Sequence, residues 1–214
     1  MKIRKLVIAV SLLLVSSNMQ SQLIQSYGIK AGFNNSKQNW HYSEKSGFDA
    51  SHIHSITGFN LGLFFESKIF SNFNLLTEIT YLQKGHTTVL PRIIRAQDGS
   101  GYIEQGENET EHKFHYLSVP IFLKYQTQVS VLGPFLAVGP SLEYLLSYPQ
   151  SSGYDHFEKL NLALNLSTGV EFSFNFLPKI LIEIRYNFGL TNSFENENVT
   201  VDNRSIIFLF GIKL

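Results

Sequence analysis

Residues 159–174 read KLNLALNLSTGVEFSF, and every second residue from Leu160 to Leu166 is a leucine. Successive side chains of a β-strand point to opposite faces, so this segment predicts a strand with one apolar face and one mostly polar face. The apolar face continues through Val170 and Phe172, whereas Glu171 falls on the other face. The segment is longer than the ~9–11 residues that a tilted strand needs to cross a bilayer.

Seven further segments show the same alternation: Tyr27–Gln38, Ile56–Ser67, Phe73–Gly85, Lys113–Tyr125, Val131–Leu146, Ile180–Leu190 and Asn203–Leu214. Their connections alternate in length. The short ones lie at Lys68–Asn72, Gln126–Ser130 and Asn175–Lys179, and the long ones are Asn39–Ser55, His86–His112, Ser147–Glu158 and Thr191–Asp202. This rhythm is typical of outer-membrane barrels. It predicts an all-β fold, an eight-stranded antiparallel up-and-down transmembrane β-barrel with short periplasmic turns and four long extracellular loops.

The start of the chain has the pattern of a secretory signal peptide. Lys2, Arg4 and Lys5 precede the apolar run Leu6–Val15, which is too short to span a bilayer. We therefore expect a signal peptide at residues 1–21 and a barrel domain at residues 22–214, located in the cell outer membrane. The chain has no cysteine, which excludes a disulfide framework.

Composition excludes other classes of protein. Seventeen basic and seventeen acidic residues cancel, so the sequence shows no electrostatic footprint for nucleic acid. Eighteen phenylalanines and ten tyrosines suit strands and the aromatic belts at a membrane interface.

The polar faces of the expected strands carry balanced charges. Four bases and four acids share the inward parity: Lys30, Glu66, Glu78, Lys124, Glu171, Glu183, Arg185 and Lys213, with Glu143 nearer a loop end. Glycines share this parity, so we expect ion pairs separated by small residues to fill the lumen. A soluble lipocalin-type barrel would instead place the apolar face inside, and a small-solute channel would leave the charged interior open.

The chain resembles a known family through motifs in a fixed order. These are Tyr27-Gly-Ile-Lys-Ala-Gly-Phe-Asn34, Gly58-Phe-Asn-Leu-Gly-Leu-Phe-Phe-Glu66, Glu78-Ile-Thr-Tyr-Leu-Gln-Lys-Gly85, Tyr116-Leu-Ser-Val-Pro-Ile-Phe-Leu-Lys124 and Glu183-Ile-Arg-Tyr186. They are similar to the PorT-like outer-membrane β-barrel proteins of the Bacteroidota. The resemblance implies a barrel of mostly undefined function, with one namesake similar to a factor of the type IX secretion and gliding apparatus. Ser118 stands where an acidic residue is common in the family.

The expected partners follow from this architecture. Outer-membrane lipid would surround the barrel. The final segment, with Phe208, Phe210, Ile212 and Leu214 alternating outward, resembles the C-terminal signal that the barrel-assembly machinery reads during biogenesis. The long loops would contact an envelope or surface protein.

Catalytic and metal-binding motifs are weak in this sequence. The seven histidines lie in or beside the expected long loops, and His52 and His54 are weak candidates for a metal because alternate residues of an extended segment face one way. Ser118 and His115 differ in parity, so no serine nucleophile meets a base. We expect a structural or interaction barrel without catalytic residues or cofactor, with a small-solute channel, a rim enzyme or a metal binder as alternatives.

Overall fold

The computed structural model describes residues 24–42, 52–95, 102–149, 157–174, 177–195 and 199–214. The expected signal peptide at residues 1–21 lies outside the described residues. Within them, the structure contains no helix long and apolar enough to cross a membrane.

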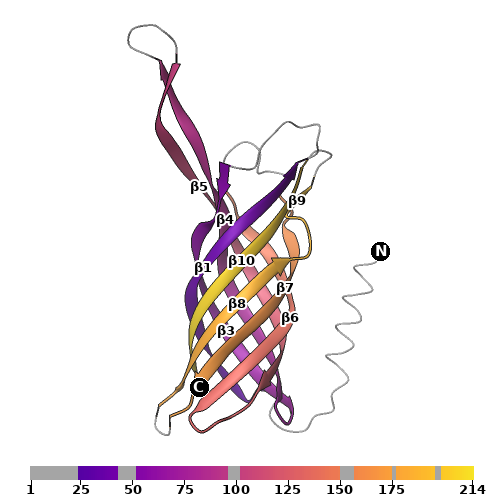
Figure 1. Ribbon diagram of the computed structural model, residues 1–214. Coiled ribbons are helices and arrows are strands. Elements are labelled where there is room, and N and C mark those ends of the chain that lie inside the picture. The colour runs from indigo at the N-terminus through magenta and orange to yellow at the C-terminus, as the bar shows by residue number, and fades with distance from the viewer. Residues whose placement is uncertain (1–23, 43–51, 96–101, 150–156, 175–176, 196–198) are drawn as a thin grey trace, which may run out of the picture.

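Eight long strands in the described residues pair antiparallel in chain order: β1 (Ser26–Tyr42), β3 (Ile56–Phe70), β4 (Phe73–Arg95), β5 (Tyr102–Gln126), β6 (Leu132–Ser147), β7 (Leu160–Phe172), β8 (Lys179–Gly189) and β10 (Val199–Lys213). Strand β10 also pairs with β1, from Gly28 opposite Lys213 to Tyr42 opposite Val199, which closes the sheet. Two short strands, β2 (Ile53–His54) and β9 (Phe194–Glu195), pair with β4 and β10. The all-β antiparallel up-and-down barrel predicted from sequence is confirmed (Figure 1).

The barrel has two unlike ends. At the short-turn end, β3 passes to β4 through Ser71 and Asn72, and β1 starts beside the end of β10. At the opposite end, which we call the long-loop end, β4 and β5 continue beyond their neighbours as a projecting hairpin (Figure 1).

This hairpin corrects the prediction of a long loop at His86–His112. Strands β4 and β5 stay paired from Gly85 opposite Lys113 to Arg95 opposite Tyr102. The segment carries polar residues on both faces, so the alternation that marks the other strands is missing from its sequence. A bulge interrupts the pairing between Pro91 and Ile93, and Gly106 lies opposite it on β5. Gly106 has a φ of 79°, a left-handed conformation that glycine adopts at little cost.

Alternation sets which side chains face outward. In β6, exposed and buried residues alternate from Leu132 to Leu146, and the same pattern runs through β3, β8 and β10. Large apolar side chains such as Leu63, Leu166 and Phe210 are therefore exposed on the outside. The lipocalin-type arrangement, with its apolar face inside, is excluded by this facing.

Aromatic side chains that face outward are grouped near each of the two ends of the barrel. Near the short-turn end, Phe73 packs between Phe70 and Tyr125 with ring centroids 4.9 and 5.1 Å apart. Near the long-loop end, Phe33 stacks on Phe208 at 5.3 Å, and Phe59 packs on Tyr81 at 5.2 Å. We call these groups the lower and upper aromatic belts.

Candidate functional site

The interior of the barrel holds its charged side chains in three clusters. The lower ion cluster lies nearest the short-turn end and consists of Glu66, Lys124, Glu171 and Lys213. Lys213 Nζ lies 2.7 Å from Glu66 Oε2 and 3.1 Å from Glu171 Oε2, and Lys124 bonds to the same two carboxylates. All four residues are at most 8% exposed. Each carboxylate is thus shared by two lysines.

The central ion cluster joins four residues from three strands, β1, β4 and β8. Lys30 Nζ lies 2.6 Å from both Glu78 Oε1 and Glu183 Oε2. Arg185 completes the ring, with Nη1 2.8 Å from Glu78 Oε2 and Nη2 2.6 Å from Glu183 Oε1. A buried charge is costly unless it is paired and hydrogen-bonded, and here every charge has two partners of opposite sign.

The upper ion cluster contains Lys84, which the sequence reasoning missed. Lys84 Nζ donates to Glu143 Oε2 and Asn187 Oδ1, both at 2.7 Å, and Asn187 Nδ2 donates to Glu143 Oε1 at 2.9 Å. Lys84 shares the parity of Glu78 on the same strand, so strict alternation would have identified it. With Lys84 and Glu143, the three clusters contain five bases and five acids.

The eight predicted site residues are all buried, and the structure brings them together in the lower and central clusters. Small residues lie between them in part, since Ser167 donates to Glu183, but small residues do not surround the cations. Four cations instead lie over aromatic rings, with Lys30 5.0 Å from the Phe64 centroid, Lys84 5.7 Å from Tyr116, Lys124 4.6 Å from Phe135 and Arg185 4.6 Å from Phe122. Such contacts stabilise a desolvated cation.

Two glycines make room for these rings. A Cβ on Gly28 would lie 2.6 Å from the Phe64 ring, and a Cβ on Gly169 would lie 2.5 Å from the Phe135 ring. At Gly28 and Gly169, the missing side chain therefore leaves space for an aromatic ring of the neighbouring strand.

An aromatic cluster lies above the upper ion cluster. Phe157, between β6 and β7, packs its ring 4.8 Å from Phe114 and 5.4 Å from Phe194, and Trp40 lies 6.5 Å from Phe157. The buried apolar side chains of Leu82, Tyr116, Leu145, Ile207 and Leu209 extend this cluster down beside the upper ion cluster, where Lys84 lies over the Tyr116 ring. A side chain from a connection thus closes the interior at the long-loop end.

One histidine is buried at the long-loop end of the barrel. His86 is 2% exposed, stacks on His112 at 4.8 Å, and its Nδ1 lies 2.6 Å from Gln38 Oε1. Since the amide oxygen only accepts, Nδ1 carries the proton. His86 lies on β4 beyond the upper aromatic belt. Burial, assisted by the neighbouring His112, lowers the pKa of His86 to about 4, so the ring is neutral at pH 7.

The weak metal candidates lie outside this interior. His52 and His54 are exposed and line a hollow of about 420 Å³ with Glu107 and Glu109. Across the described ranges, no three histidine, aspartate or glutamate side chains are grouped closely enough to hold a metal ion.

Ser118 faces the lumen, whereas His115 faces outward and contacts Tyr81. As their difference in parity predicts, they do not meet.

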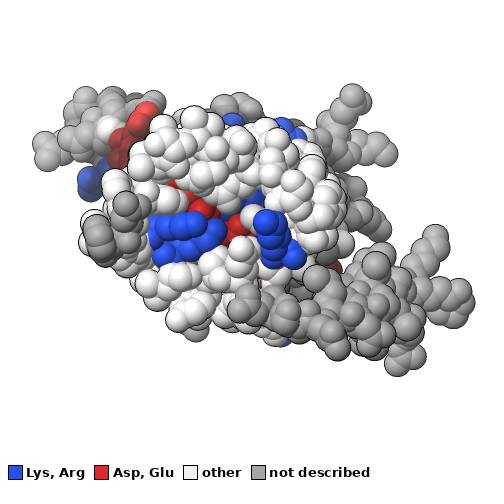
Figure 2. Space-filling model, turned by 90° about the horizontal axis from the view of Figure 1, so that it is seen from below, with Lys and Arg blue, Asp and Glu red and all other residues white. Residues whose placement is uncertain are grey.

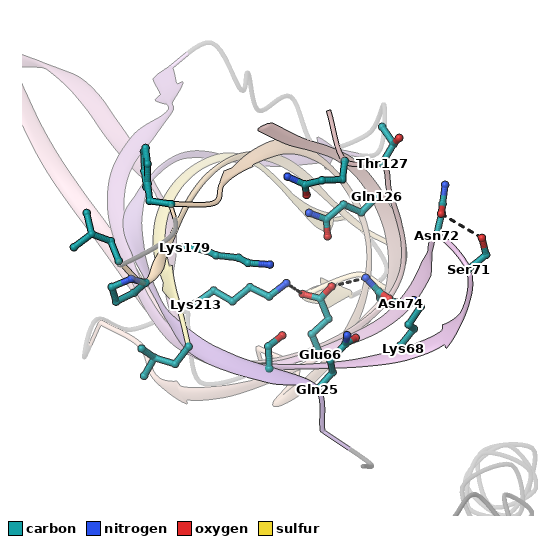
Figure 3. Close-up of a pocket in the computed structure, with 16 residues that line it drawn as sticks. Gln25, Glu66, Lys68, Ser71, Asn72, Asn74, Gln126, Thr127, Lys179 and Lys213 are labelled. Carbon is teal, nitrogen blue, oxygen red and sulfur yellow. Dashed lines mark hydrogen bonds and ion pairs between the residues drawn. The ribbon is translucent and has the colours of Figure 1, made fainter. Parts of the chain in front are cut away.

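A larger cavity of about 570 Å³ opens at the short-turn end, and we call it the lower mouth. Figure 2 shows this end of the molecule, with basic side chains on both sides of a hollow and acidic ones deeper inside. Glu66 and Lys213 form its floor, and Lys179 reaches into the opening beside Lys213 (Figure 3).

Residues 20–195 match the model of a family described as the outer membrane protein beta-barrel domain. No curated protein matches the sequence. Among solved structures, OprG from Pseudomonas aeruginosa shares the fold, being 12% identical with a TM-score of 0.51, over 92% of this chain and 99% of that one. Neisserial surface protein A is 17% identical with a TM-score of 0.49, over 88% and 96%. The Escherichia coli outer membrane protease OmpT is 11% identical with a TM-score of 0.48, over 92% and 99%.

Proposed function

This chain belongs to the family of outer membrane protein β-barrel domains and lies in the outer membrane, and from that premise we propose that it is a closed barrel that acts through its long-loop end. In this proposal, eight strands span the membrane. The band between the aromatic belts faces lipid, because its outward side chains are apolar and exposed.

The observation that carries the proposal is the filled interior. Three ion clusters and the aromatic cluster succeed one another from the lower mouth to Phe157. Each charge is satisfied by partners within the barrel, so a passing solute would have to break several buried ion pairs in turn. We therefore favour a plugged barrel over a small-solute channel.

The proposed orientation places the short-turn end in the periplasm and the long-loop end outside the cell, as in bacterial barrels generally. The projecting hairpin then stands furthest from the membrane (Figure 1). It exposes Glu107, Glu109 and Glu111 beside Val89 and Pro91. This surface is the part of the described chain best placed to contact an envelope or surface protein.

The finer family relationship is part of the same proposal. The ordered motifs support a PorT-like barrel of the Bacteroidota, assembled by the barrel-assembly machinery and related in role to secretion or gliding components. We propose no enzymatic role, since the lumen-facing charged residues are committed to ion pairs and Ser118 does not meet His115.

The natural absence of cysteine makes a direct test possible. In intact cells, Glu109→Cys should react with a membrane-impermeant maleimide, and Asn72→Cys at the short-turn end should react only after the outer membrane is permeabilised. The reverse labelling pattern would refute the orientation. A crosslinker attached at Glu109→Cys should join the barrel to one defined protein, whereas a lipid-facing control, Leu63→Cys, should not. Equal crosslinking from both positions would refute an interaction role for the hairpin.

A further inference from the structure

The lower mouth has the features of a binding site rather than of a closed end. Its lining combines five carboxamides, the rim lysines Lys68 and Lys179, and an apolar lip that includes Phe174, Leu177 and Pro178. Its volume of about 570 Å³ falls within the usual range of ligand pockets, ~300–1,000 Å³.

The charge of the mouth favours an anion. At the floor, Glu66 and Glu171 each accept hydrogen bonds from both Lys124 and Lys213, so these two acids and two bases cancel. At the rim, Lys68 and Lys179 form no ion pair with an acid in the described part of the chain. Two cations are therefore left to attract a negative group.

The polar lining favours a peptide over a phosphate. Carboxamides both donate and accept hydrogen bonds, as the N–H and C=O groups of a peptide require. A phosphate presents mainly acceptor oxygens, which would leave the carboxamide oxygens that line the mouth without a donor. The apolar lip of Phe174, Leu177 and Pro178 provides a contact for an apolar side chain next to the rim lysines.

We propose that the lower mouth binds an acidic peptide segment, with Lys179 pairing to a carboxylate and the carboxamide oxygens of Asn74 and Gln126 accepting hydrogen bonds from peptide N–H groups. The Nδ2 of Asn74 and the Nε2 of Gln126 already donate to Glu66 Oε1 and to the Gly133 carbonyl oxygen. Figure 3 shows Lys179 reaching into the opening, with Gln126 on another side of it. Given the proposed orientation, the segment belongs to a periplasmic partner. The mouth thus adds a second contact surface, at the opposite end of the barrel from the hairpin.

Fluorescence anisotropy tests this with the full barrel in uncharged detergent micelles, where both ends are accessible. The probe is a labelled Ala-Ala-Asp-Glu peptide with a free carboxylate. Saturable binding is expected, about tenfold weaker in Lys179→Gln because one charge-assisted hydrogen bond is lost. Lys159→Gln, an exposed lysine beyond the other end of the barrel, is the matched control and should bind normally.

Three results would overturn the proposal: equal binding of an amidated Ala-Ala-Asn-Gln peptide, equally effective displacement by inorganic phosphate, or unchanged affinity in Lys179→Gln. Because both ends of the barrel are accessible to the peptide in micelles, the binding result does not depend on how the barrel is oriented in the membrane. Failure of peptide binding and failure of the cell-labelling test are therefore distinguishable.

Discussion

Lys84 and Glu143 form a buried ion pair across the lumen, with Lys84 Nζ 2.7 Å from Glu143 Oε2 and both side chains at most 2% exposed. The pair joins strands that are not neighbours in the sheet, since β4 and β6 are separated by β5. Such contacts connect separate parts of the barrel wall and occupy the lumen at the same time.

Removing one partner of this pair should destabilise the barrel strongly. Lys84→Met leaves Glu143 buried with an uncompensated charge, at a cost of about 3 kcal/mol in the free energy of unfolding. The double variant Lys84→Met/Glu143→Gln should recover part of that loss. Urea unfolding in phospholipid vesicles measures both. Lys113→Met breaks an exposed pair with Glu111 and should cost at most about 0.5 kcal/mol; an equal cost at both lysines would contradict the role of the buried pair.

Overpacking at Gly169 should also destabilise the fold. The Cβ of Gly169→Ala would lie 2.5 Å from the Phe135 ring and would also clash with the Ile182 carbonyl oxygen. We expect a loss of about 1–3 kcal/mol in the same unfolding assay. Adding Phe135→Leu should restore part of it by relieving the ring contact. An unchanged free energy of unfolding in Gly169→Ala would show that the close approach of Phe135 does not require glycine at this position.

Stability should depend on His86 in the acidic range. The pKa of His86 is about 4 in the folded protein, because burial disfavours the charged ring, and about 6.5 when unfolded. The unfolded chain therefore binds more protons between these values. Stability is fully present above pH ~6.5 and falls by up to about 3 kcal/mol as the pH drops to ~4.

Burial also lowers the pKa of the neighbouring His112, so the contribution of His86 is isolated by comparison with His86→Gln. The substitution should flatten the pH dependence of unfolding between pH 6.5 and 4. An unchanged slope in His86→Gln would show that the ring is not held neutral.

The aromatic cluster has a built-in reporter, since Trp40 is the one tryptophan of the chain. Phe157→Ala removes the ring between Trp40 and Phe114. Trp40 emission should then shift to longer wavelength as water enters, with a loss of about 3 kcal/mol in stability. Phe174→Ala, an exposed ring near the short-turn end, should leave the emission unchanged. No shift in Phe157→Ala would place Trp40 outside the cluster.

Alternation in the sequence predicts the strands and the facing of most side chains, because successive residues of a strand in a barrel wall point to opposite faces. Parity alone assigns Lys30, Glu78 and Glu183 to the inside. It does not show which of them meet, because Lys30 on β1 contacts partners 48 and 153 residues away. Those contacts depend on how the sheet closes.

Alternation fails where both faces of a segment have the same polarity. The polar hairpin beyond Gly85 has the sequence pattern of a loop. Phe64 and Phe65 are adjacent aromatic residues, so the sequence does not show that the Phe64 ring lies inside the barrel. The lower mouth could not be predicted either. Its lining comes from turns and strand ends that are distant in sequence and converge only when β10 pairs with β1.

Conductance across a planar lipid bilayer tests the central claim most directly. The barrel, reconstituted alongside a general porin as positive control, should show no current steps above the bare membrane, because the ion clusters and the aromatic cluster fill its interior. Phe157→Ala should remain silent as well, since the three ion clusters persist. Steady open steps of reproducible size from the native protein would contradict a closed barrel.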